Sequence, residues 1–302
     1  MADQQATAGG GGLSGSGNAG LFTGILLCFG SMSSIQFGSA FSATAIHAFG
    51  PSTTTFLRLV MAAAILALIV RPPMRSYSRE QWKSAALLGA TMAAMTLCFF
   101  AAIARIPLGL AVAIEFLGPL AVATWSLGKG WRLVWPVAAF IGVVLLSHDG
   151  AGWVGDPVGM LFAVGAGIGW GTYIILMKKT GAVFKGLEGL SMSLIFAAIA
   201  AAPFGLPNVG EALNPEGLGM MLGLAILVPL FPYALEMIAL RRMPMSAFGI
   251  LMSLEPALGA LAGFLVLSQP MTPLQMLGTA LVVAASAGVT SSGNGEGEGK
   301  TA

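Results

Sequence analysis

Four ionisable side chains lie inside apolar segments that are long enough to span a membrane, which is an unusual place for charge. They are Glu115, Glu236, Glu255 and Arg58. An ionised group within a bilayer is costly, and by default it marks an ion or substrate pathway. Carboxylates in such a place can bind an ammonium group or take up and release protons, and a guanidinium can hold a carboxylate in a bidentate pair. This set of residues therefore predicts transport chemistry.

Glu115 and Glu255 are predicted to lie near the middle of the membrane. Glu115 follows Pro107 by eight residues, or about 12 Å of helix, and Glu255 follows Pro244 by eleven, or about 16 Å. The hydrocarbon core is about 30 Å thick, so both positions are central. The alternative is that either carboxyl group is protonated or hydrogen-bonded and only packs.

Glu236 and Arg58 are predicted to lie at shallower depths. Glu236 precedes Arg241 by five residues, about 7–8 Å of helix, so it can reach the interface or pair with Arg241 or Arg242. The long side chain of Arg58 can snorkel toward the membrane surface. Alternatively, Arg58 is the partner of Glu115 or clamps a substrate carboxylate.

Two further groups of residues within the spans can shape a site. Gln36, Trp170 and Tyr173 are polar or amphipathic, and they either line a site or pack in the core. A proline inside a helix removes one i−4 hydrogen bond, and broken helices free backbone groups at transporter binding sites. The alternative is that such kinks only shape packing. The candidate helix breaks are Pro119, Pro256, Pro229 and Pro232.

The elements that carry these residues must be membrane helices. Of the 302 residues, 56% are hydrophobic and only 9% are charged, and the mean hydropathy is +0.86. This composition excludes an ordinary soluble enzyme, a disordered chain and a nucleic-acid binder. Backbone groups in lipid must pair within their own segment, so the apolar stretches are helices. Ten are predicted: 20–42, 53–70, 84–104, 107–127, 132–148, 156–177, 187–206, 218–240, 245–267 and 273–291.

The basic residues predict the orientation of these ten helices. With a cytoplasmic N-terminus, twelve of the 14 Lys and Arg residues fall in cytoplasmic loops or tails, and only Arg105 falls in an outer loop. The positive-inside rule therefore places both termini in the cytoplasm.

The two halves of the chain resemble each other. Residues 101–123 align with 238–260 at a constant offset of 137, which matches Arg105 with Arg242 and Pro119 with Pro256. Each copy holds five spans, an odd number, so the second copy enters the membrane inverted. Inverted repeats are typical of secondary transporters. The predicted fold is thus an all-α membrane protein with ten transmembrane helices in two inverted five-helix repeats. Its predicted divisions are a flexible tail at 1–19, repeats at 20–150 and 151–291, and a flexible tail at 292–302.

Three segments carry a resemblance to a known family: IPLGLAVAIEFLGPLAVA (106–123), FPYALEMIAL (231–240) and LMSLEPALGA (251–260). With weaker support from SIQFGSA, FLRL and GWGTYIIL, the chain resembles EamA-type members of the drug/metabolite transporter superfamily, in the threonine/homoserine exporter branch. The resemblance implies an exporter of small amino acids in the bacterial inner membrane. Small residues are expected to leave room for the substrate, while Phe37 narrows the site. They are Gly38, Ala113, Gly118 and Gly259.

Other functions fit the residues less well. There is no Walker-type phosphate loop, so a proton gradient is the expected driver. An intramembrane enzyme would need a mid-span His or a Ser/His pair, and a channel would not need an inverted repeat. The spacing of Cys and His predicts neither a metal nor a cofactor.

The expected partners are a small-molecule substrate, protons and lipid, without nucleic acid. A purine, an aromatic amino acid or a toxic analogue is the alternative substrate, and the choice between monomer and homodimer stays open.

Overall fold

The computed structural model describes residues 14–127, 133–149, 152–240, 242, 248 and 251–294. Within these ranges the regular structure is helical, apart from an isolated β-bridge between His148 and Trp153. The helices of the first half are α1 Ser14–Phe49, α2 Pro51–Val70, the 3₁₀ turn η1 Met74–Ser76, α3 Arg79–Ile103, α4 Leu108–Leu127 and α5 Val134–Leu146. Those of the second half are α6 Pro157–Val183, α7 Glu188–Gly205, η3 Leu206–Ala212, α8 Pro215–Ala225, η4 Ile226–Leu230, α9 Phe231–Leu240, α11 Glu255–Leu267 and α12 Pro273–Asn294.

Local sequence explains where several helices begin. Gly50 adopts a φ of 80°, which allows the tight turn from α1 into α2, and Pro51 then occupies the first turn of α2. Ser78 and Gln81 form a reciprocal capping box at the start of α3. The side chains of Asp156 and Asn214 cap α6 and α8.

The prediction of a multi-pass helical membrane protein is confirmed. Among the described residues, six helices are long and apolar enough to cross a bilayer: Phe22–Phe49, Pro51–Val70, Arg79–Ile103, Leu108–Trp125, Pro157–Val183 and Glu188–Ala212. Shorter apolar helices are Val134–Leu146, Pro215–Leu230, Glu255–Leu267 and Pro273–Val289. That all ten cross the membrane stays a prediction.

Two predicted spans are interrupted in the structure. The span expected at 218–240 contains a break at 226–230, where Val228 leaves helical geometry with φ −151° and ψ 114°. The span expected at 245–267 has a turn at Ser253 and Leu254, and α11 begins only at Glu255. Residues 245–247 and 249–250 of that span lie outside the described residues. The helices also extend into the predicted tails at 1–19 and 292–302, since α1 begins at Ser14 and α12 continues to Asn294.

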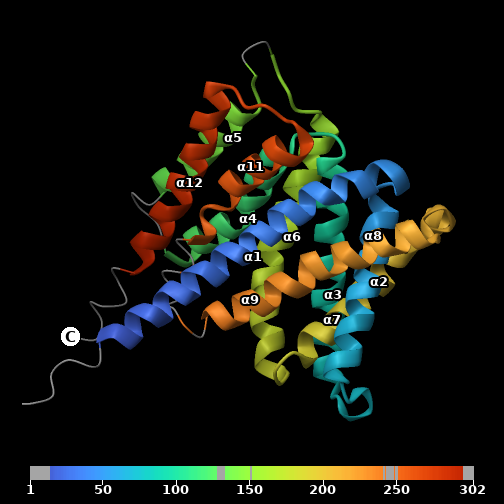
Figure 1. Ribbon diagram of the computed structural model, residues 1–302. Helices are drawn as coiled ribbons and strands as arrows, with labels where there is room; N and C mark the ends of the chain where they lie inside the picture. The colour runs from blue at the N-terminus through green and yellow to red at the C-terminus, as the bar shows by residue number, and fades with distance from the viewer. Residues whose placement is uncertain are drawn as a thin grey trace, which may run out of the picture.

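Several helix contacts have counterparts when the two halves of the chain are exchanged, and Figure 1 labels the helices that make them. Three contacts join corresponding helices directly: α2 with α7, α4 with α11, and α5 with α12. Others occur in matched pairs. The contact of α3 with α6 corresponds to that of α9 with α1, and α4 with α6 corresponds to α11 with α1. Each half therefore relies on the other for much of its packing surface.

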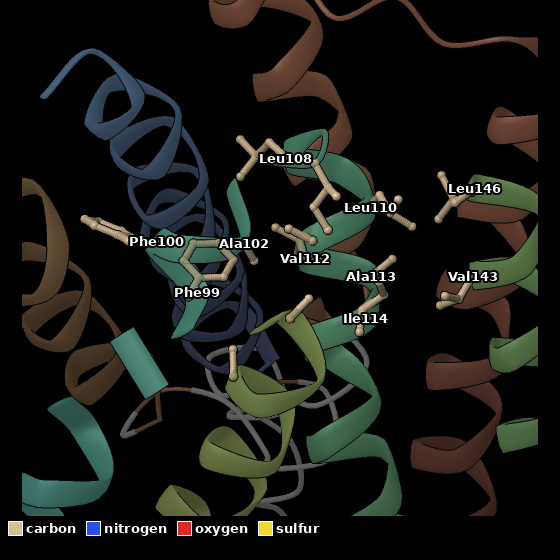
Figure 2. Close-up of a cluster of buried hydrophobic side chains, with 14 of the residues drawn as sticks. Phe99, Phe100, Ala102, Leu108, Leu110, Val112, Ala113, Ile114, Val143 and Leu146 are labelled. Atoms are coloured by element: carbon tan, nitrogen blue, oxygen red, sulfur yellow. The ribbon is translucent and has the colours of Figure 1, made fainter. Parts of the chain in front are cut away.

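A buried apolar cluster packs around α4 (Figure 2). Leu108, Val112 and Ile114 of α4 lie on the side of Phe99 of α3, and the cluster extends to Val143 of α5. Because fixed side chains surround α4 on several sides, its one ionisable residue, Glu115, has a defined position.

Loops that were predicted to share a side of the membrane contact one another. Tyr77 donates a hydrogen bond to Glu188 at 3.0 Å, which joins the α2–α3 loop to the start of α7. At the other end Arg105 lies 3.7 Å from Asp156, which links the α3–α4 loop to the cap of α6. Which of these ends faces the cytoplasm stays a prediction.

Candidate functional site

A cavity of about 190 Å³ lies between α1, α2, α3, α4, α6, α9 and α11. All seven side chains predicted for a substrate or proton site line it: Gln36, Arg58, Glu115, Trp170, Tyr173, Glu236 and Glu255. A cavity needs roughly 10–15 Å³ on this measure to hold one water molecule. The space is therefore large enough for a small organic molecule. Residues that lie up to 219 positions apart in the chain meet here only because the two halves pack face to face.

Arg58 is the positive charge of the cavity wall. Its side chain is 5% exposed, and its guanidinium carbon lies 4.3 Å above the centre of the Phe100 ring. The alternative that Arg58 snorkels to the membrane surface is therefore wrong. The Phe100 ring attracts the cation through its π face, which keeps Arg58 directed inward.

Glu236 has a partner on a neighbouring helix. Ser31 of α1 donates a hydrogen bond to Glu236 Oε1 at 2.7 Å. Pairing with Arg242 was the alternative, but Arg242 is exposed, and Arg241 lies outside the described residues. The hydrogen bond to Ser31 holds Glu236 in the cavity wall.

Glu255 and Glu115 differ from Glu236, and from each other, in burial and in hydrogen bonding. Glu255 is 1% exposed, and within the described part of the chain neither of its carboxylate oxygens has a hydrogen-bond partner. Glu115 is only half-buried, because it faces the cavity. Glu255 lies close enough to both Glu236 and Glu115 to interact with their charges. The cavity therefore combines three carboxyl groups with one guanidinium.

The four predicted helix-breaking prolines behave differently. Pro229 lies in the break at 226–230, where the freed carbonyl of Leu227 accepts a 2.7 Å hydrogen bond from Ser34. Pro232 and Pro256 lie in the first turns of α9 and α11. The N–H groups of a first turn have no acceptor within the helix, so a proline there removes no helical hydrogen bond.

The prediction that Pro119 breaks its helix is wrong, because α4 runs through it from Leu108 to Leu127. The physical reason is the close packing of α4 against α6. A β-carbon placed on Gly167 would lie 2.9 Å from the carbonyl oxygen of Glu115, the group that Pro119 leaves without its helical donor. Contact with α6 at this level holds α4 in helical geometry.

The small residues expected to leave room for substrate serve helix packing instead. Gly38, Ala113, Gly118 and Gly259 are not among the residues that line the cavity. Gly118 faces the backbone of Gly167, and a β-carbon on Gly259 would lie 2.9 Å from Val112. Phe37 packs against the apolar cluster around α4 and does not narrow the cavity.

Several cavity residues were not predicted from the sequence. They are apolar or weakly polar side chains that occur throughout membrane helices: Ile35, Ser39, Leu59, Met92, Met95, Thr96, Phe99, Phe100, Val228 and Met252. No signal in the sequence separates them from packing residues. Within the described part of the chain, no cluster of His, Cys, Asp and Glu has the arrangement of a metal site.

The chain is similar in sequence to known transport proteins. The model of the EamA-like transporter family matches residues 157–291. The threonine/homoserine exporter RhtA of Escherichia coli (strain K12) is 36% identical over 274 residues, covering 88% of this chain and 90% of that protein. RhtA of Salmonella typhimurium (strain SL1344) is 36% identical over 268 residues, again covering 88% and 90%.

Two more distant similarities agree with these. The uncharacterized transporter YwfM of Bacillus subtilis is 26% identical over 253 residues, covering 79% of this chain and 85% of that one. A solved crystal structure of a protein with 19% sequence identity superposes with a TM-score of 0.57, covering 91% of this chain and 97% of that chain. At that level of identity the similarity shows the fold alone.

Proposed function

The chain belongs to the EamA-like transporter family, in the branch of the threonine/homoserine exporters, and we propose that it exports small amino acids of this kind by secondary active transport. It is a multi-pass membrane transporter of a small molecule and not an enzyme. The names of its relatives support the substrate class and the direction of transport.

The observation that carries the proposal is the placement of opposite charges around one cavity. An amino acid is a zwitterion, so its site needs an anion for the ammonium group and a cation or helix N-terminus for the carboxylate. Arg58 is suited to the carboxylate, and Glu115 and Glu255 are suited to the ammonium group. The hydroxyls of Ser39 and Thr96 also line the cavity and can bind a short hydroxylated side chain.

Proton coupling and alternating access complete the proposed mechanism. Intramembrane carboxyl groups are typical proton sites, and three of them line this cavity. The helix contacts that correspond between the two halves support two inverted five-helix repeats, at 20–150 and 151–291. These repeats move relative to each other around the cavity. The break at 226–230 and the turn before α11 give hinges next to the site.

The proposed membrane arrangement follows from the charges and the packing. Ten helices cross the bacterial inner membrane, and both termini lie in the cytoplasm.

Counterflow in proteoliposomes tests the function. Vesicles loaded with unlabelled threonine or homoserine should accumulate labelled threonine transiently, and glycerol-loaded vesicles should not. Arg58→Ala should reduce the initial rate by at least about tenfold, the loss expected when a hydrogen-bonded charge partner is removed. The control is Arg75→Ala, which removes an exposed arginine of the α2–α3 loop. An absence of counterflow with every small hydroxylated amino acid would contradict the proposal.

The aromatic part of the cavity favours a second candidate substrate. Phe99, Phe100, Trp170 and Tyr173 all line it, and such rings can stack on a purine or an aromatic amino acid. The same assay with adenine and phenylalanine separates the two candidates. If these compounds exchange and threonine does not, the protein is still an exporter, but of another substrate class.

A further inference from the structure

One part of the cavity wall contains hydrogen-bond acceptors without donors. Within the described residues, Oε1 and Oε2 of Glu255 and Oε1 of Gln36 have no hydrogen-bond partner. Both side chains are buried, with exposures of 1% and 3%, and both belong to the cavity lining. Buried acceptors are normally satisfied, so atoms of this kind beside a cavity indicate a ligand that brings donors.

The three atoms come from one small region where α1 meets α11. A β-carbon placed on Gly259 would lie 3.1 Å from Gln36 Oε1. Residues 255 and 259 are one helical turn apart and therefore share a face of α11. The glycine lets the amide of Gln36 lie against α11 one helical turn from Glu255, and both side chains line the same cavity.

The surrounding polar groups are already engaged or differ in character. Glu236 accepts a hydrogen bond from Ser31, and the guanidinium of Arg58 stacks on Phe100. Glu115 faces the open cavity. The region around Glu255 and Gln36 thus offers three acceptors to one ligand group.

We propose that Gln36 Oε1 and the two carboxylate oxygens of Glu255 form a subsite for a primary ammonium group. The inference rests on the proposed function. A primary ammonium presents three N–H donors and no acceptor, which matches the three oxygens in number and in kind. A secondary ammonium presents only two donors and adds a methyl group, so it leaves one oxygen without a partner. The subsite therefore selects amino acids with a free amino group and rejects their N-methyl analogues and 2-hydroxy acids.

The first experiment uses the unmodified protein. Counterflow of labelled threonine is measured against unlabelled threonine, N-methylthreonine and a 2-hydroxy acid of similar size. The half-saturating concentration for N-methylthreonine should exceed that for threonine by about tenfold or more, as expected for the loss of a charge-assisted hydrogen bond. The 2-hydroxy acid should not exchange. If the N-methyl compound exchanges as well as threonine, the subsite is wrong even though the exporter is active.

The second experiment assigns this selectivity to Gln36. Gln36→Met keeps the length of the side chain but removes the amide, and it should reduce the preference for threonine over N-methylthreonine to less than about threefold. Gln36→Glu keeps an acceptor oxygen and should retain the preference. Thr172→Val is the control, because Thr172 is exposed and its hydroxyl bonds only the carbonyl of Ile168 in its own helix.

Three results would overturn the assignment. In the first, Gln36→Met changes the pH dependence of transport but not the preference for the primary amine, so the acceptors handle a proton. In the second, counterflow requires sodium and stops when choline replaces it, so they hold a metal cation. In the third, Gln36→Glu loses the preference as fully as Gln36→Met, so the amide N–H is the important group. A protein that exchanges no small amino acid fails earlier, at the proposed function.

Discussion

At the scale of single residues, the three intramembrane carboxyl groups have separate environments. From the sequence all three are candidate proton or substrate sites, with Glu115 and Glu255 predicted near the middle of the membrane and Glu236 at a shallower depth. In the structure Glu236 has Ser31 as its partner, Glu115 faces the cavity, and Glu255 is buried without a partner among the described residues. Glu255 therefore depends most on what enters the cavity.

Replacing Glu255 should affect transport more than replacing Glu236. Glu255→Gln keeps the shape but loses the charge and the exchangeable proton, so pH-driven transport should fall by at least about tenfold. Glu236→Gln should cause a smaller loss, because an amide oxygen can still accept the hydrogen bond from Ser31. Initial rates under an imposed pH gradient measure both, after expression levels are matched. Wild-type rates for Glu255→Gln at every gradient would show that this carboxyl group is structural.

Tyr77 gives a prediction outside the membrane-spanning segments. Burial, and then the hydrogen bond to Glu188, raise the pKa of Tyr77 to about 12 from 10.0. Between these values the folded protein keeps a proton that the unfolded chain has released, so this contribution to stability is complete below pH 10 and is lost as the pH rises toward 12.

Tyr77→Phe removes this contribution. At pH 8 the variant should be less stable by about 0.5 kcal/mol, the low end for a hydrogen bond that is partly exposed. The difference should shrink as the pH passes 10, because only the wild type then loses stability through this group. Thermal unfolding in detergent at several pH values measures it. A constant difference from pH 8 to 11 would contradict the assignment.

At the scale of helices, close glycine contacts hold the two halves together. Gly142 of α5 and Gly278 of α12 face each other, and a β-carbon on either would lie 2.6 Å from the carbonyl oxygen of the other. Backbone atoms cannot move aside as a flexible side chain can, so the two helices would have to separate. Such contacts are typical of packing between membrane helices.

Gly142→Ala should therefore lower the stability of the protein by about 1–3 kcal/mol, the usual cost of overpacking. The matched control is Gly223→Ala in α8, where no described atom outside the neighbouring backbone of the helix lies within 4 Å of the added β-carbon. There the substitution should be neutral or stabilise by about 0.5–1 kcal/mol through helix propensity. Thermal unfolding of both variants in the same detergent gives the comparison. Equal stability of the two variants would show that α5 and α12 can separate without cost.

At the scale of the whole molecule, the cavity lies between the two halves of the chain, which share several corresponding helix contacts. Contacts such as α3 with α6 and α9 with α1 correspond to one another, and loops at each end are joined by Tyr77–Glu188 and Arg105–Asp156. A cavity at such an interface changes its access when the halves rotate, as alternating access requires.

Reporter tags test the orientation of the molecule. Tags at the N-terminus and the C-terminus should both report a cytoplasmic location, and a tag within 207–217 should report the outer side. The positive-inside distribution of Lys and Arg is the physical reason. An outer C-terminus would imply an odd number of crossings and would remove the case for two inverted repeats of five.

Composition, residue spacing and the family resemblance were enough to predict the class of the molecule, its family and its candidate residues. The length of the apolar segments and the scarcity of charged residues required membrane helices. The cost of charge in a bilayer identified Glu115, Glu255 and Arg58 as candidate functional residues. These inferences depend on transfer from water to lipid, which is a property of local composition. They therefore needed no knowledge of which helices are neighbours.

The assembled fold shows which of those residues meet and what each one contacts. It directed Arg58 inward over Phe100, paired Glu236 with Ser31, and brought Glu255 and Gln36 to the wall of one cavity. It also kept α4 continuous through Pro119, where the sequence predicted a break, and assigned the small residues to helix crossings. Each outcome depends on a neighbour far away in the chain. The physical reason is that hydrogen bonds and packing act over a few ångströms, so their partners are set by how the helices assemble.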